Sequence, residues 1–141
     1  MPERRVSTQL KRAVEERAGG CCEYCRGQAR LAMHSFSAEH IVPRVKGGET
    51  TIENLAFACQ GCNGHKYTKT ESPDPVTGKS VSLFHPRQNN WSGHFAWSND
   101  FTHIRGLTPT GRATIGALKL NRQELVTLRR ILYAAGEHPP M

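Results

Sequence analysis

The chain has 141 residues, of which 37% are hydrophobic and 7% aromatic, so it can build one small domain with a modest core. Its 19 Lys and Arg outnumber its 12 Asp and Glu, and the net charge of +7 favours a polyanionic partner, with nucleic acid ahead of an anionic membrane surface. A basic protein with no such partner remains an alternative. Signal-peptide and membrane-spanning runs are not found in the sequence, so we expect a cytoplasmic protein without a membrane partner.

The first half of the chain alternates helical and extended patterns around an irregular loop. Ser7 or Thr8 can cap the first helix, and Gly19-Gly20 can end it. Pro43 and Gly47-Gly48 mark the loop. The elements expected here are a helix over 7–18, strands over 31–37 and 52–58, and a helix over 61–68.

The second half is predicted to contain a connector, strands and two helices. Residues 71–79 are rich in Pro, Thr and Gly and predict a turn-rich connector. After it we expect a strand over 81–84, a hairpin pairing 94–97 with 102–105, and a helix beginning at Thr108-Pro109.

The last helix has the clearest local pattern. Asn121 and Glu124 resemble a capping box, and Gly136 is expected to end the helix. The residues predicted to form its buried stripe are Leu125, Leu128, Ile131 and Leu132.

Two Cys-x-x-Cys pairs bracket the middle of the chain. A reducing cytoplasm favours metal binding over disulfides, and four thiolates suit a closed tetrahedral zinc site. Residues 26–58 separate the pairs, which is more than the roughly 15–20 residues of a simple zinc ribbon. The predicted ligands of a structural zinc ion are Cys22, Cys25, Cys59 and Cys62. The fifth cysteine, Cys21, leaves an alternative register with Cys25 open.

Residues suited to phosphodiester hydrolysis lie between and just after the cysteine pairs. His40 can act as a general base, because an imidazole titrates near working pH. Glu39 offers the hard oxygen that Mg²⁺ prefers, and Asn63 can add an amide oxygen at a helix start. Asn54 can hold the imidazole in its working orientation.

These residues together resemble the HNH endonuclease family. The matching run comprises the first Cys-x-x-Cys, Glu39-His40-Ile-x-Pro43, Gly47-Gly48, Asn54-Leu55, and Cys59-x-x-Cys62-Asn63-x-x-Lys66. It covers about a third of the chain. The resemblance implies a ββα-metal fold, with His40 as base, Asn54 orienting it, and Glu39 and Asn63 binding a catalytic divalent cation such as Mg²⁺ or Mn²⁺.

The motif departs from the commonest family pattern at two positions. Asn63 stands where His is frequent, although asparagine also occurs there in active members, and Glu39 stands where Asp is frequent. Both departures leave the preferred metal open. His65 is an alternative metal ligand.

Basic side chains near the motif are candidate contacts for DNA phosphates. The candidates are Arg44, Lys46, Lys66, Lys69 and Arg87. His85 is a further residue to test, whereas Trp91, Phe95 and Trp97 are expected in the core. Phosphate contacts predict binding that weakens steeply with salt.

The sequence therefore predicts an α+β fold with a treble-clef-like ββα core stapled by zinc. We expect one domain over 1–141, with a catalytic core over 7–70 and an extension of strands and helices over 71–141. The predicted function is metal-dependent cleavage of DNA. Two alternatives are a zinc module that binds nucleic acid without cutting it and a redox or metal-handling protein. The sequence does not specify the target sequence, the oligomeric state or the role of the extension.

Overall fold

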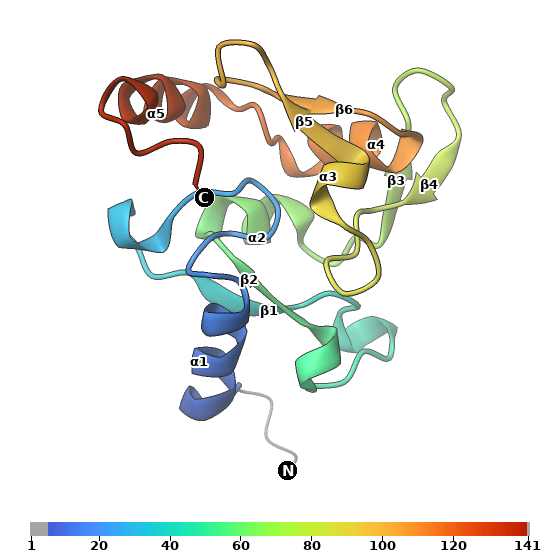
Figure 1. Ribbon diagram of the computed structural model, residues 1–141. Coiled ribbons are helices and arrows are strands. Elements are labelled where there is room, and N and C mark those ends of the chain that lie inside the picture. The colour runs from blue at the N-terminus through green and yellow to red at the C-terminus, as the bar shows by residue number, and fades with distance from the viewer. Residues whose placement is uncertain (1–5, 141) are drawn as a thin grey trace.

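The computed structural model describes residues 6–140, which form five α-helices and six short strands (Figure 1). In chain order these elements are α1 (Thr8–Arg17), β1 (Ser37–His40), β2 (Leu55–Ala58), α2 (Gln60–Lys66), β3 (Glu71–Pro73), β4 (Ser80–Ser82), α3 (Trp91–His94), β5 (Phe95–Trp97), β6 (Ile104–Gly106), α4 (Pro109–Leu118) and α5 (Gln123–Ala134). Short 3₁₀ turns occur at Ala29–Leu31, Arg44–Lys46 and Ile52–Asn54.

The β1–β2 hairpin is the centre of the N-terminal half. The strands pair antiparallel, with Ser37 opposite Ala58 and His40 opposite Leu55. Helix α1 packs against both strands and α2 packs against β1, and Figure 1 shows the hairpin between the two helices. All four residues of β2 are buried as a result. This arrangement is the expected ββα core of an α+β fold.

The predicted first helix is confirmed. It spans Thr8–Arg17, and the Ser7 hydroxyl accepts a hydrogen bond from the Leu10 amide at its start. Val14 is completely buried in the core. Arg17 extends from its last turn to the carbonyls of Ile52 and Leu55, at 2.7 and 2.5 Å, so this helix is also tied to the start of β2.

The strand predicted over 31–37 is wrong for most of its length. Pairing begins only at Ser37, because its partner Ala58 is the last residue of β2 and Cys59 then caps α2. Residues before Ser37 therefore have no strand of this hairpin beside them. Met33, in the middle of the predicted strand, is 96% exposed. The strand predicted over 52–58 is likewise shorter and starts at Leu55.

The connector predicted over 71–79 is in fact half of a hairpin. Strand β3 pairs with β4, with Ser72 opposite Val81. The intervening turn is organised by the buried carboxylate of Asp74, which accepts hydrogen bonds from Val76 and Thr77 and forms two more with Arg112 of α4 at 2.9 Å. The guanidinium of Arg112 lowers the pKa of Asp74. Repeated turn residues concealed this hairpin in the sequence.

The hairpin predicted near residue 100 is confirmed, with β5 paired to β6. The helix predicted at Thr108-Pro109 is confirmed as well, and the Thr108 hydroxyl accepts from the Gly111 amide. The short helix α3, immediately before β5, was not predicted. It lies among aromatic residues, with the Trp91 ring centroid 5.2 Å from that of Phe95.

The capping box predicted for the last helix is wrong. Asn121 does not cap α5, because its amide pairs with both the N–H and the C=O of Ile104 in β6, at 2.7 and 2.9 Å. Arg122 occupies the N-cap position and makes no side-chain capping bond.

The buried stripe of α5 is also wrong in part. Leu128 and Ile131 are 41% and 59% exposed, whereas Val126 and Arg129 are buried. Arg129 donates to the carbonyls of Thr102 and Leu120, at 3.0 and 2.7 Å. Satisfying these carbonyls turns α5 away from the orientation that its leucines predict.

The C-terminal extension shares a core with the ββα unit. Phe84, which follows β4, packs edge-on against Tyr24 at a ring-centroid distance of 6.4 Å. Leu118 and Leu120 are fully buried in the same cluster as Leu55. Among the described residues, no helix is long and apolar enough to cross a membrane.

We expect Arg129→Met to lower the free energy of unfolding by about 2–4 kcal/mol, because it leaves buried carbonyls without a donor. Arg130→Met, at the exposed neighbouring position, should change the free energy by less than about 0.5 kcal/mol. Urea unfolding of both variants measures the difference. Equal stability of the two would contradict the observed orientation of α5.

Candidate metal centre and active site

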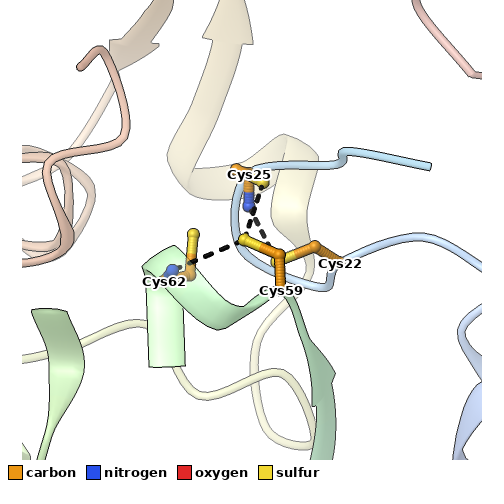
Figure 2. Close-up of side chains that lie close together, drawn as sticks. All are labelled: Cys22, Cys25, Cys59 and Cys62. Carbon is orange, nitrogen blue, oxygen red and sulfur yellow. Dashed lines mark hydrogen bonds between the residues drawn. The ribbon is translucent and has the colours of Figure 1, made fainter. Parts of the chain in front are cut away.

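Four cysteines from two parts of the chain converge on one point. Cys22 and Cys25 belong to the loop after α1, Cys59 follows β2, and Cys62 lies in the first turn of α2 (Figure 2). Their sulfur atoms all lie within 4.8 Å of one another. Within residues 6–140 this is the group of Cys, His, Asp and Glu positioned to hold a metal ion, and Cys21 is not part of it.

The backbone around the cysteines is folded so that amides point at the sulfurs. The amide of Cys25 donates to the Cys22 sulfur at 3.5 Å, and that of Gly27 donates to the Cys25 sulfur at 3.4 Å. The Cys62 amide donates to the Cys59 sulfur at 3.4 Å, which also caps α2. Such donors stabilise thiolates. Cys21 instead turns away and donates to the Gly19 carbonyl.

The donor set fits a structural zinc ion. A tetrahedral zinc with bonds of about 2.3 Å separates its sulfurs by about 3.8 Å, and the sulfurs of Cys25 and Cys59 lie 3.7 Å apart. Burial raises the pKa of the Cys22 thiol well above its ordinary value, so a bound cation would be needed to hold this residue as a thiolate. Four thiolates leave no coordination position for a substrate.

Arg122 from the C-terminal extension contacts this metal centre directly. Its guanidinium lies 3.5 Å from the Cys59 sulfur and 3.8 Å from the Cys62 sulfur. A Cβ atom at position 61 would overlap the guanidinium, so Gly61 is required for this approach. Zinc with four thiolates would carry a formal charge of −2, and Arg122 would offset part of it within the protein.

His40, the last residue of β1, is held by a hydroxyl. Its Nε2 lies 2.8 Å from the Thr50 Oγ1, and the same hydroxyl accepts a hydrogen bond from Arg44 at 3.0 Å. When Nε2–H donates to Thr50, the lone pair of Nδ1 is left to accept a proton. This tautomer has the form that a general base requires.

The imidazole of His40 is kept neutral by its surroundings. Partial burial lowers the pKa of His40, and the positive charges of Arg44 and Lys66 lower it further. A lowered pKa keeps the proton-accepting form populated at neutral pH.

Asn54 acts on the loop and not on the imidazole, which corrects its predicted role. Its side-chain amide donates to the carbonyls of Val42 and Glu49 and accepts from the Val42 amide, at 2.9–3.0 Å. Gly48 allows this close crossing, because a Cβ there would overlap the Val42 carbonyl. Asn54 thereby fixes the loop that carries Thr50, and its bonds to Ile41 and Val42 also hold the backbone directly after His40.

Glu39 lies in a different environment, although it adjoins His40 in sequence. Successive residues of a strand point to opposite faces, and Glu39 points toward α2. Its two oxygens accept from the Tyr24 hydroxyl at 2.5 Å and from the Lys66 ammonium at 3.3 Å. The carboxylate is 5% exposed, and burial raises its pKa. Both oxygens already accept a hydrogen bond and a lysine ammonium lies beside one of them, so this arrangement does not fit a divalent cation bound by Glu39.

The remaining predicted site residues are dispersed. Asn63 lies one turn before Lys66 on α2 and is half-buried, as is His65. His85 lines a cleft of about 490 Å³, which is also lined by Ile41 and Val42, the two residues after His40.

The predicted phosphate contacts are corrected at two positions. Lys66 is 1% exposed and its ammonium pairs with the buried Glu39. Arg87 forms a nearly buried ion pair with Glu23. Neither side chain is free for DNA. Lys46 and Lys69 are exposed, and Arg44 is half-buried beside Thr50.

Sequence reasoning missed three residues that shape the site. Tyr24 lies between the first two cysteines and contacts Glu39, Thr50 holds His40, and Arg122 contacts the sulfurs. Tyr24 and Thr50 were inside the recognised motif, so their positions offered a signal. Arg122 is 60 residues beyond Cys62, and nothing in the sequence links the two.

These features define a small α+β protein with a ββα core and a four-cysteine metal centre. Residues 22–69 match the family model described as HNH endonuclease. The predicted resemblance is thus confirmed for the segment that holds all four cysteines, and it indicates a nuclease or another nucleic-acid-related function. None of the curated proteins and none of the solved structures matches the chain.

We expect Arg122→Gln to accelerate zinc loss to a colorimetric chelator by about tenfold, because the thiolates lose a charged partner outside the metal. Lys119→Gln, at an exposed position just before it, is the matched control and should release zinc at the wild-type rate. Equal release by all three proteins would show that Arg122 does not stabilise the centre.

We expect the imidazole of His40 to titrate with a midpoint below 6.5, the ordinary value for histidine. Arg44→Met should raise the midpoint, because it removes a nearby positive charge that disfavours the imidazolium. Lys46→Met, at an exposed position in the same loop, should have a smaller effect. Nuclear magnetic resonance of the ring nitrogens measures the midpoints, and an unchanged value in Arg44→Met would contradict this account.

Proposed function

We propose that the protein is an endonuclease that hydrolyses phosphodiester bonds in DNA. The observation that carries this proposal is the contact of His40 with the Thr50 hydroxyl, which also accepts a hydrogen bond from Arg44, inside the segment that matches the HNH family. A protein that only binds nucleic acid has no need of a neutral imidazole held by a hydroxyl. The net charge of +7 supports a polyanionic substrate.

In this proposal His40 is the general base. Nδ1 takes a proton from a water molecule, the water oxygen attacks phosphorus, and the bond from phosphorus to the leaving oxygen breaks. Thr50 fixes the ring through Nε2, and Asn54 fixes the loop that bears Thr50. Arg44 supplies positive charge next to the base, where the phosphate must lie for the attack.

The exposed lysines supply the contacts to the DNA backbone. Lys46 lies in the loop after His40, and Lys69 follows α2. Contacts of this kind release counterions, so binding should weaken as salt rises. One HNH site cuts one strand, and double-strand breaks would need two copies or two events.

A divalent cation, Mg²⁺ or Mn²⁺, remains part of the proposal because the family resemblance implies one. Such an ion stabilises the charge that develops on the phosphate and the leaving oxygen. Asn63, which is half-buried in the first turn of α2, is the proposed ligand. Glu39, the second expected ligand, is engaged by Tyr24 and Lys66, and no step is assigned to it.

The second candidate function is a zinc module that binds nucleic acid without cutting it. The ion pair between Glu39 and Lys66 favours this candidate, because a carboxylate paired with a lysine does not bind the divalent cation of a nuclease. Both candidates share the zinc centre and the basic surface. They differ in whether His40 performs chemistry.

Nicking of supercoiled plasmid distinguishes these functions. With zinc-loaded protein and Mg²⁺ or Mn²⁺, we expect nicked circles from the wild type and at least about a hundredfold less from His40→Ala, which removes the base. Thr50→Val, which keeps the shape but removes the hydroxyl, should reduce nicking less severely. His34→Ala, at an exposed histidine before β1, is the matched control.

Nicking that persists in His40→Ala would reject the assigned base. A folded wild type that binds plasmid and leaves it intact in every metal would favour the binding module. Reactivity of all four clustered cysteines toward a thiol reagent, with zinc bound, would instead favour a redox or metal-handling protein.

A further inference from the structure

A buried polar network occupies the space between β1 and α2. Its centre is the Lys66 ammonium, whose side chain is 2% exposed. The ammonium lies 3.3 Å from a Glu39 oxygen, 2.8 Å from the Ile41 carbonyl and 3.4 Å from the His40 carbonyl. The second Glu39 oxygen accepts from the Tyr24 hydroxyl at 2.5 Å.

The hydrogen-bond acceptors around the Lys66 ammonium are all oxygen atoms of the kind that bind hard cations. One is a carboxylate oxygen and two are backbone carbonyl oxygens, the set that Mg²⁺ or Mn²⁺ takes from proteins. An ammonium has three protons to donate, and here each proton has an acceptor. The three oxygen atoms therefore each accept a hydrogen bond from Lys66, and all three ammonium protons are donated.

A divalent cation cannot join this network while the lysine remains. A cation bound by Glu39 would lie beside the ammonium, and two positive charges repel strongly where water is excluded. Moving Lys66 out would also leave Glu39 as an unpaired buried carboxylate until the cation arrives. Lys66 faces this network because Cys62, one turn earlier on α2, is held in the four-cysteine cluster.

We propose that the Lys66 ammonium takes the place of a divalent cation beside Glu39, so that Glu39 is a structural partner of α2 and not a metal ligand. This inference refines the proposed nuclease and rests on that function only for its consequence in catalysis. The test itself measures metal binding without DNA. Any cation that the nuclease uses is then bound by the substrate phosphate and by groups other than Glu39.

Manganese binding by zinc-loaded protein tests the proposal. Free Mn²⁺ is followed by electron paramagnetic resonance as protein is added. Glu39→Gln keeps the contact with Tyr24 and removes the charge, and we expect it to bind Mn²⁺ within about twofold of the wild type. Lys66→Met keeps the length of the side chain without its charge, and it should gain a Mn²⁺ site at least about tenfold tighter than any in the wild type.

Two further variants identify the carboxylate. The site gained in Lys66→Met should disappear when Glu39→Gln is added to it. Glu49→Gln, at an exposed carboxylate in the neighbouring loop, should leave the gained site intact. Zinc content and circular dichroism establish that each variant is folded.

The proposal is overturned if Glu39→Gln weakens Mn²⁺ binding about tenfold or more, or if folded Lys66→Met gains no site. If Lys66→Met does not fold, the comparison of wild type with Glu39→Gln decides the outcome alone. Plasmid nicking by the same preparations is a separate readout. If the wild type does not nick while the variants show the expected pattern of Mn²⁺ binding, the result counts against the proposed function and leaves this inference standing.

Discussion

The convergence of four sulfurs within 4.8 Å is the constraint on which the rest of the molecule depends. It joins the loop after α1 to the junction of β2 and α2, segments that are more than 30 residues apart in sequence. Cys59 both binds in this cluster and caps α2, so the metal centre fixes where the helix starts. That start sets which residues of α2 face the hairpin, and Lys66 is one of them. A change at the centre would therefore alter contacts around Glu39 that lie a full turn or more away.

Two cations from outside the hairpin, one buried and one half-buried, complete the core. Arg122 donates to the sulfurs of Cys59 and Cys62, and Lys66 donates to Glu39. Each cation lies against negatively charged or thiol groups, which are the sulfurs for Arg122 and the Glu39 carboxylate for Lys66. Removing one member of such a pair leaves an uncompensated buried charge, which costs more than the pair contributes. This gives the C-terminal extension a physical role, because its Arg122 supplies a contact that the metal centre otherwise lacks.

Local patterns predicted the parts of the fold that depend on local interactions. The four-cysteine cluster followed from cysteine spacing, and the cap of α4 followed from Thr108 and the proline after it. The errors arose where distant residues decide the outcome. Asn121 resembles a cap but pairs with Ile104, and the predicted strand before Ser37 lacks a partner beyond Ala58. Within the candidate site, His40 and Asn54 were proposed from their motif, whereas the hydrogen-bond partners of their side chains are set by loop geometry that no spacing rule describes.

The pleat of β1 limits how a phosphate can reach the site. Glu39 and His40 are neighbours in sequence, yet Glu39 contacts Lys66 of α2 and His40 contacts Thr50 in the loop. Adjacent strand residues point to opposite faces, so a phosphate that reaches the imidazole does so from the loop side. Arg44 and Lys46 are the cations on that side, and Asn54 holds their loop in place. In the proposed nuclease, substrate recognition and the base therefore depend on one loop, while Glu39 and Lys66 join the strand to its helix.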